Sequence, residues 1–248
     1  MRCVRFCFVF PAALAVLGAC AQAHADSPKV AVVTGGHGFE KAPFLAMFEG
    51  HKGVEFEHVD LHDDSEIFDD IAQWPYDGIV LFNMIQRISE KRRANFLELL
   101  DQGVALVVLH HAIAAFSQWP EYRKIIGARY YLKDITEDGV THPRSQYDHD
   151  MDFDIHIEDP DHPVTRGVGD FRVHDETYKG FTLEPDNHLL LTTDHPKSQK
   201  EVGWARNYRN ARVVFIQMGH GPGIYGNEAY RRLLVQAVRW TTKEDSEP

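Results

Sequence analysis

The stretch VALVVLHHA, residues 104–112, decides the fold of this 248-residue chain. Its apolar run has no polar alternation, which predicts a strand buried on both faces, as in a parallel sheet covered by helices. His110 and His111 follow the run directly. Because such sheets bind ligands just beyond the carboxyl ends of their strands, this pair is either part of a site or the polar end of a buried strand.

Short apolar runs alternate with helical patterns on both sides of this stretch. Further strands are predicted at 29–34, 54–59, 78–82 and 212–218, and helices near 43–48, 66–72, 89–100, 119–126 and 227–241. Ser89 and Asn227 are predicted N-caps, and Gly127 is a predicted helix end. Such alternation predicts one α/β domain with a doubly wound, mostly parallel sheet and helices on both faces.

The sequence pattern changes between residues 130 and 193, where the segments become shorter and more polar. Apolar segments at 152–157, 171–173 and 189–192 alternate with polar residues. We expect them to form extra edge strands joined by long loops that wrap over the edge of the sheet.

Residues 1–25 are expected to be an export signal, which leaves 26–248 as the folded domain. Arg2 and Arg5 precede an apolar segment too short to be a confident membrane span. The A-x-A pattern at 23–25 predicts cleavage before Asp26 and a periplasmic or extracellular product. An alternative is a lipobox ending at Cys20, whose lipidation would anchor the chain; only that anchor or the signal would contact a membrane.

Composition narrows the classes of partner and chemistry. The chain has 37 acidic and 26 basic residues, a formal net charge of −11, which argues against nucleic acid. Cys3, Cys7 and Cys20 all lie in the leader, so the mature body has no thiol nucleophile. The glycine turn GGHG at 35–38 lacks the spacing of a dinucleotide loop and the P-loop lysine, so no nucleotide cofactor is expected. The oligomeric state is left unpredicted.

Side chains capable of chemistry recur where the predicted strands end. They are His37, Asn83, His110, His111 and His220. Because these ends share one edge of a parallel sheet, we expect the side chains to converge on one pocket, although each histidine alone could simply cap a strand. Asp175 and Glu176 beside Tyr178 suit acid–base catalysis or metal binding, and a solvated loop is the alternative.

Five segments stand out in order along the chain: VVTGGHGF at 32–39, LHHAIAAFSQWPEYRKIIGARYY at 109–131, HPVTRGV at 162–168, HDETY at 174–178 and VVFIQMGHG at 213–221. Together they resemble the ThuA-like (trehalose utilization) family over about residues 29–242. This resemblance implies a flavodoxin-like fold related to class I glutamine amidotransferases, whose cysteine nucleophile would stand where His110 and His111 lie. The absence of cysteine from the mature chain excludes that chemistry. The resemblance implies instead a link to trehalose, sucrose and related glycosides, with 3-keto sugars as intermediates.

The leading hypothesis is an exported enzyme of carbohydrate catabolism, of isomerase, lyase or hydrolase type. It would act on 3-keto disaccharides or glycosides by histidine and carboxylate acid–base chemistry. The predicted catalytic residues are His110, His111, Asp175 and Glu176, and the predicted substrate contacts are Asn83, His149, Tyr178 and Trp119. A divalent metal, Zn or Mn, is predicted at His37, His111, Glu176 and His220. Two alternatives stay open: a noncatalytic carbohydrate-binding module on the same fold, and a subunit of a larger assembly.

Overall fold

The computed structural model describes residues 27–62, 64–137 and 139–243. The predicted export signal and its two processing sites lie outside these residues. Within them, no helix has the length and apolar character needed to cross a membrane.

One large sheet organises the described part of the chain. Its strand order is β2-β1-β3-β4-β13-β12-β11-β8-β9. The parallel strands are β2 (Glu55–Asp60), β1 (Lys29–Gly35), β3 (Gly78–Asn83), β4 (Ala105–Leu109) and β13 (Ala211–Ile216). Their spatial order is that of flavodoxin-like proteins, so the predicted doubly wound α/β fold is confirmed.

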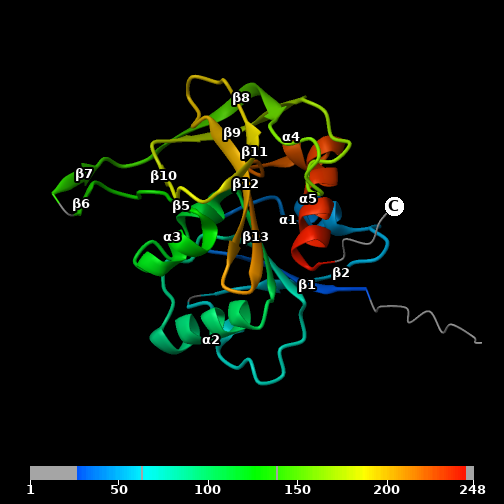
Figure 1. The fold of residues 1–248 in the computed structure, drawn as a ribbon, viewed down its shortest axis with the longest axis vertical. Coiled ribbons are helices and arrows are strands. Elements are labelled where there is room, and N and C mark those ends of the chain that lie inside the picture. The colour runs from blue at the N-terminus through cyan, green and yellow to red at the C-terminus, as the bar shows by residue number, and fades with distance from the viewer. Residues whose placement is uncertain (1–26, 63, 138, 244–248) are drawn as a thin grey trace, which may run out of the picture.

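The remaining four strands of this sheet run antiparallel and form the edge arm. They are β12 (Glu201–Tyr208), β11 (His188–Thr192), β8 (Gln146–Ile157) and β9 (Phe171–Lys179). Two small antiparallel sheets accompany them: β5 (Ala128–Arg129) with β10 (Thr182–Leu183), and β6 (Ile135–Glu137) with β7 (Val140–His142). The β6–β7 hairpin projects from the body at the left of Figure 1.

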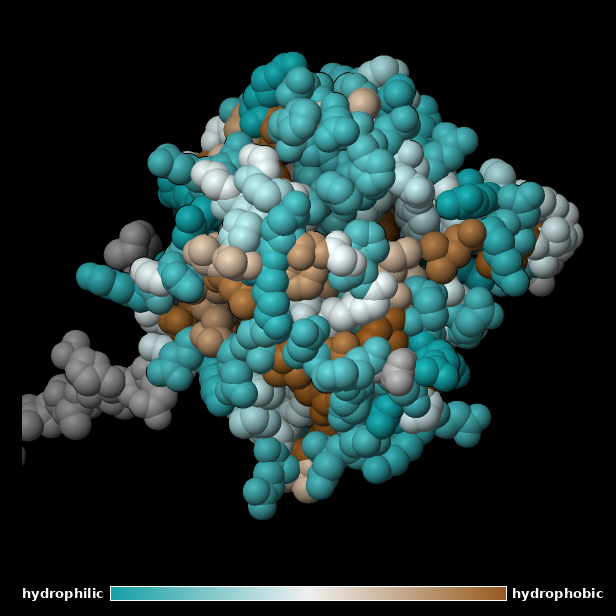
Figure 2. All heavy atoms as spheres, turned by 180° about the vertical axis from the view of Figure 1, so that it is seen from behind, coloured by the Kyte–Doolittle hydropathy of each residue, from teal (hydrophilic) through white to brown (hydrophobic). Residues whose placement is uncertain are grey.

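Helices cover both faces of the sheet because its central strands are apolar on both. Leu106 and Val108 of β4 pack into one core with α2 (Glu90–Asp101) and α3 (Pro120–Ile126). Val107 and Leu109 pack into a second core with α1 (Lys41–Leu45), α4 (Pro222–Tyr225) and α5 (Glu228–Thr241). Figure 1 shows these two groups on opposite sides of the strands. Figure 2 shows a mostly hydrophilic surface, with hydrophobic side chains in patches across its middle.

The predicted helix signals act as expected. The Ser89 side chain accepts a hydrogen bond from the backbone N–H of Arg92, and Asn227 accepts one from Tyr230. Gly127 ends α3 with φ 84°, a left-handed conformation that glycine adopts without steric cost. Short 3₁₀ turns complete the set: η1 (Ala46–Phe48), η2 (Glu66–Phe68) and η3 (His110–Ala114).

The structure differs from the prediction in the polar half of the chain. The acidic helix expected at 66–72 is only the turn η2, and β12 was not predicted. The segments around His149 and Glu176, which the predicted strands at 152–157 and 171–173 leave out, lie inside β8 and β9. Local polarity was misleading because these strands direct polar side chains inward, as Arg206 of β12 does: it is buried and bonded to Asp186.

Candidate functional site

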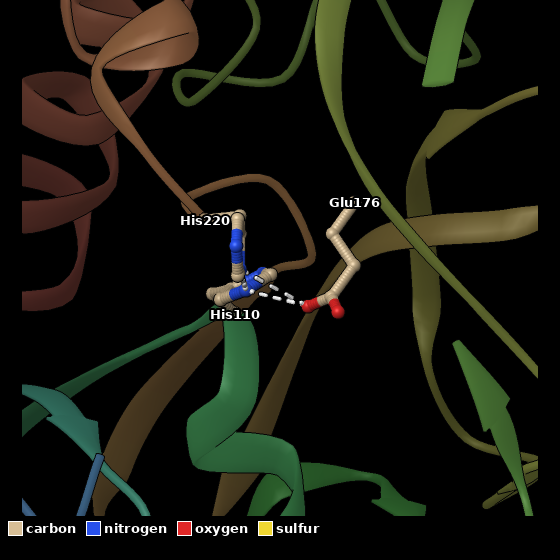
Figure 3. A group of neighbouring side chains, drawn as sticks. All are labelled: His110, Glu176 and His220. Carbon is tan, nitrogen blue, oxygen red and sulfur yellow. Dashed lines mark hydrogen bonds and ion pairs between the residues drawn. The ribbon is translucent and has the colours of Figure 1, made fainter. Parts of the chain in front are cut away.

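The site lies at the carboxyl edge of the parallel strands, where the edge arm folds across it. His37 follows β1, His110 follows β4 and His220 lies beyond the end of β13. Strand β9 supplies Glu176 from the edge arm. Figure 3 shows the Glu176 carboxylate facing both His110 and His220. Residues more than a hundred positions apart in the sequence therefore meet at one point.

His110 is wholly buried and holds a left-handed backbone, with φ 52°. Its Nδ1 lies 2.8 Å from the carbonyl oxygen of Gln217, which can only accept, so this nitrogen carries a proton. The opposite nitrogen, Nε2, lies 2.9 Å from the Tyr178 hydroxyl and 3.1 Å from Glu176 Oε2. The turn that ends β4 thus aims one imidazole nitrogen at the carboxylate.

Glu176 is the centre of a histidine cluster. Its Oε2 also lies 3.3 Å from His220 Nδ1, and its Oε1 lies 3.2 Å from His149 Nδ1. Burial alone would raise the pKa of Glu176, but hydrogen bonds with His110 and His220 hold it well below its usual range. The hydrogen bond with Glu176 raises the pKa of His220. The cluster therefore holds an ionised carboxylate.

Asp175 positions a loop. Its two oxygens accept hydrogen bonds from the backbone N–H groups of Gly219, at 2.7 Å, and His220, at 2.9 Å. Burial raises the pKa of Asp175. Gly219 has φ 144°, and a Cβ there would lie 3.0 Å from the Cβ of His110, so the loop approaches β4 only because this residue is glycine.

A pocket of about 250 Å³ opens beside Glu176. The residues that line it are His37, Met84, His111, Ile113, Ala114, Tyr130, Leu132, Arg144, Tyr147, His149, Glu176 and Tyr178. The rings of His37 and His111 stack with centroids 4.5 Å apart. Both ring nitrogens of His111 are buried, and within the described residues neither makes a well-formed hydrogen bond, although the backbone of Phe82 lies within reach of the ring. Burial lowers the pKa of His37 and lowers that of His111 further, so both imidazoles stay neutral.

The structure brings most of the predicted site residues close together but places them in different positions. The pocket wall contains five of them: His37, His111, His149, Glu176 and Tyr178. His110 and His220 contact Glu176 but do not line this pocket, and Asp175, which holds the loop, lines a second pocket together with His220. The donor atoms that lie close together differ from the predicted metal set in two members. His37 and His111 stack on each other, and the donor atoms that converge belong to His110, Glu176 and His220.

Two predicted substrate contacts do not line the pocket. Trp119 is buried at the start of α3, where its ring stacks with Tyr122 and contacts Phe116. It packs in the hydrophobic core beside α3 and does not line the pocket beside Glu176. Asn83 is also wholly buried, and neither of its polar side-chain atoms has a partner among the described residues.

Sequence reasoning missed several pocket residues. Tyr130, Tyr147 and Arg144 line it, together with the apolar Met84, Ile113 and Leu132. One signal was available: Tyr147 and His149 are two positions apart, and strand periodicity places such residues on one face. Their ring centroids lie 5.2 Å apart. Met84 directly follows β3 and Ile113 lies in η3, whereas Tyr130, Leu132 and Arg144 lie in loops with no local pattern.

Comparisons with known proteins agree with this architecture. A ThuA-like protein from Parabacteroides merdae superposes with a TM-score of 0.73 at 18% identity, over 89% of this chain and 92% of that one. A second, from Bacteroides uniformis, gives 0.63 at 20% identity, over 96% and 97%. A GH42 β-galactosidase from G. stearothermophilus gives 0.55 at 12% identity, over 89% of this chain but only 30% of that one.

These likenesses show the fold alone, and no curated protein matches the chain. The family model described as trehalose utilisation, ThuA, matches residues 29–241, which include every histidine and carboxylate of the site. The chain therefore belongs to the ThuA family of trehalose utilisation.

Proposed function

We propose that this chain is an enzyme of carbohydrate catabolism that acts on a 3-keto disaccharide or 3-keto glycoside. The observation that carries the proposal is His111, a neutral, buried imidazole on the pocket wall whose nitrogens make no well-formed hydrogen bond among the described residues. An unpaired buried polar group costs about 1–3 kcal/mol, so such a group is typical of a site that completes itself with a ligand. The pocket, of about 250 Å³, is large enough for one sugar ring.

A 3-keto sugar gives this arrangement a reaction. The proton on C2 is acidic because it lies beside the carbonyl at C3. His111 takes that proton as general base, and the electron pair moves into the C1–C2 bond as the C1–oxygen bond breaks. His149, held by Glu176 at 3.2 Å, gives a proton to the departing oxygen. This elimination leaves an unsaturated keto sugar and an alcohol, and it needs no oxidant. Isomerisation would begin with the same proton transfer from C2 to His111.

The test uses the chain from Asp26 onward with 3-keto trehalose, 3-keto sucrose and their unoxidised parents. Mass spectrometry separates the reactions, because elimination splits the substrate, hydration adds one water and isomerisation leaves the mass unchanged. We expect His111→Asn to lower kcat by about 100-fold or more with a small change in KM. His188→Gln is the matched control, because His188 bonds to Asp159 outside the pocket. If the protein converts none of these 3-keto sugars, the proposal is overturned.

A noncatalytic carbohydrate-binding module is the second candidate. Tyr147 favours it: this side chain lines the pocket and is 48% exposed, which suits stacking on a sugar ring. Calorimetry with the same sugars distinguishes the two. Binding without turnover, weakened by Tyr147→Ala and unaffected by His111→Asn, would support the module.

The proposed setting is outside the cytoplasm, on the basis of the leader at 1–25. Mass analysis of the amino terminus from fractionated cells tests it. A chain that begins at Asp26 supports free export, a lipid-modified Cys20 supports an anchor, and an intact leader on the cytoplasmic protein contradicts both.

A further inference from the structure

We propose that His110 Nε2, Glu176 Oε2 and His220 Nδ1 form a binding site for a divalent metal ion, zinc being the favoured ion. These atoms come from the end of β4, from β9 and from the loop after β13, as Figure 3 shows. Metal binding is a property of these three side chains and can be measured without any substrate. Its catalytic use, by contrast, rests on the proposed function.

The first argument is the size of the donor triangle. Its three sides are 3.1 Å from His110 to Glu176, 3.3 Å from His220 to Glu176 and 3.4 Å between the two nitrogens. A tetrahedral zinc ion bound at about 2.0–2.1 Å keeps its ligand atoms about 3.3–3.4 Å apart. The triangle therefore already has nearly the dimensions of one face of a zinc tetrahedron.

The second argument is proton accounting at His110. Its Nδ1 proton is used by the Gln217 carbonyl, so in the neutral ring Nε2 has only a lone pair. Three groups nevertheless converge on Nε2: Tyr178 Oη, Glu176 Oε2 and His220 Nδ1. A single added proton could serve only one of them. A metal cation, in contrast, can be coordinated by the lone pairs of both imidazoles and by the carboxylate at the same time.

The third argument is the support around the three donors. Metal-binding histidines generally donate the other ring N–H to a carbonyl or carboxylate, as His110 does to Gln217. The second carboxylate oxygen, Oε1, contacts His149, which fixes the orientation of Glu176. The Asp175 carboxylate accepts a hydrogen bond from the backbone N–H of His220 and so holds that part of the loop. Each proposed ligand thus has a partner that fixes its direction.

The fourth argument is access. The His110 side chain is fully buried and that of Glu176 is 6% exposed, whereas His220 is 36% exposed. Glu176 lines the pocket of about 250 Å³ and His220 lines a second one of about 280 Å³, so the donor triangle is bordered by cavities through which an ion or a ligand can enter. Two histidines and one carboxylate with an open position are the donor set of catalytic zinc sites. At that position the ion would polarise the carbonyl of a keto sugar.

The test begins with chelator-treated mature protein, titrated with zinc and, separately, manganese in a calorimeter. We expect one zinc ion per chain and weaker binding of manganese. We expect His110→Asn, Glu176→Gln and His220→Asn each to weaken zinc binding by about 100-fold or more. Asparagine is chosen at position 110 because it tolerates a left-handed backbone. Cobalt substitution adds a readout of ligand geometry, because tetrahedral cobalt absorbs visible light strongly.

Two control variants separate this ligand set from others. His111→Asn should keep the zinc stoichiometry, because His111 stacks on His37 and lies outside the donor triangle. His188→Gln should also keep it. His220 lies on a partly exposed loop, so His220→Asn carries the test if a substitution of a buried ligand fails to fold.

The outcomes distinguish this proposal from the proposed function. The metal site is overturned if wild-type protein binds no stoichiometric zinc, or if all three ligand variants bind it as tightly as wild type. Turnover of a 3-keto sugar by metal-free protein would overturn the catalytic use of the metal alone. Stoichiometric zinc in a protein that transforms no sugar would support the metal site and reject the proposed enzyme.

Discussion

The two adjacent histidines that end β4 have different surroundings because the backbone turns sharply between them. His110 has φ 52° and contacts Glu176, whereas His111 points to the pocket and stacks on His37. A residue other than glycine held in this left-handed region costs roughly 1–2 kcal/mol. The packing of Gly219 and the bond to Gln217 hold His110 there. This strained turn directs the two imidazoles to different surroundings, His110 toward Glu176 and His111 toward the pocket.

Asp175 gives a prediction at this scale. In Asp175→Asn the amide can replace one of the two acceptor oxygens but sets an NH₂ group against the other backbone N–H. We expect urea denaturation to show a loss of about 1–3 kcal/mol in the free energy of unfolding, since a buried donor is left unsatisfied. Zinc affinity should also fall, because the His220 loop loses its anchor. Unaltered zinc affinity in a folded Asp175→Asn protein would contradict the positioning role.

At the scale of elements, the end of α3 depends on one glycine. Gly127 has φ 84°, and a Cβ there would collide with Asn187, Arg206 and Trp204. We expect Gly127→Ala to lower the free energy of unfolding by about 2–4 kcal/mol, from the left-handed backbone together with overpacking. Gly169→Ala is the matched control, because nothing lies within 4 Å of the Cβ position there. Equal stability of the two variants in urea would contradict this account.

The edge pair β1–β2 gives a pH prediction. His58 Nε2 lies 2.8 Å from the Thr34 hydroxyl, which itself donates to Asp60, and burial lowers the pKa of His58. A histidine with a lowered folded pKa binds fewer protons in the folded state than in the unfolded state. Its contribution is therefore present above the unfolded pKa and lost as the pH falls through about 6.5 toward the folded value.

Replacing His58 removes that contribution. We expect the loss of stability between neutral and mildly acidic pH to be shallower in His58→Gln than in wild type, as measured by urea denaturation across the range. His51→Gln is the control, because that ring bonds to the backbone of Met47 at another position. A slope unchanged by His58→Gln would contradict the assignment.

At the scale of the whole molecule, the site joins two halves of one sheet. His110 follows a parallel strand, while Glu176 lies in the antiparallel edge arm. A metal bound between them would bridge segments that otherwise meet through strand pairing and the core. Ligands that bind only the folded state stabilise it by mass action.

This bridging gives a prediction for the intact protein. At a free zinc concentration of about 100 times Kd, we expect a gain of about 2.7 kcal/mol and a rise in Tm of about 5–10 °C. Scanning calorimetry with and without zinc measures it. The Glu176→Gln protein should show much less of this gain. An equal rise in that variant would place the zinc elsewhere.

The sequence by itself determined the architecture of the parallel half. Continuous apolar runs must be buried on both faces, and that is a local property of strands such as 105–109. The carboxyl-edge position of His37, His110 and His220 follows from the same topology. The sequence also predicted that Glu176 belongs with these histidines, although it placed Glu176 after a strand and not within one.

Only the tertiary structure decided which atoms meet. The register of β9 turns Asp175 toward the loop after β13, while the next residue, Glu176, faces the pocket. A shift of one residue would exchange them, because side chains alternate between the faces of a strand. The backbone turn after β4 likewise decides which of His110 and His111 faces Glu176. Packing against the core decides that Trp119 is buried. The physical reason is that local patterns specify burial, whereas contacts between distant residues depend on strand order, register and the turns between them.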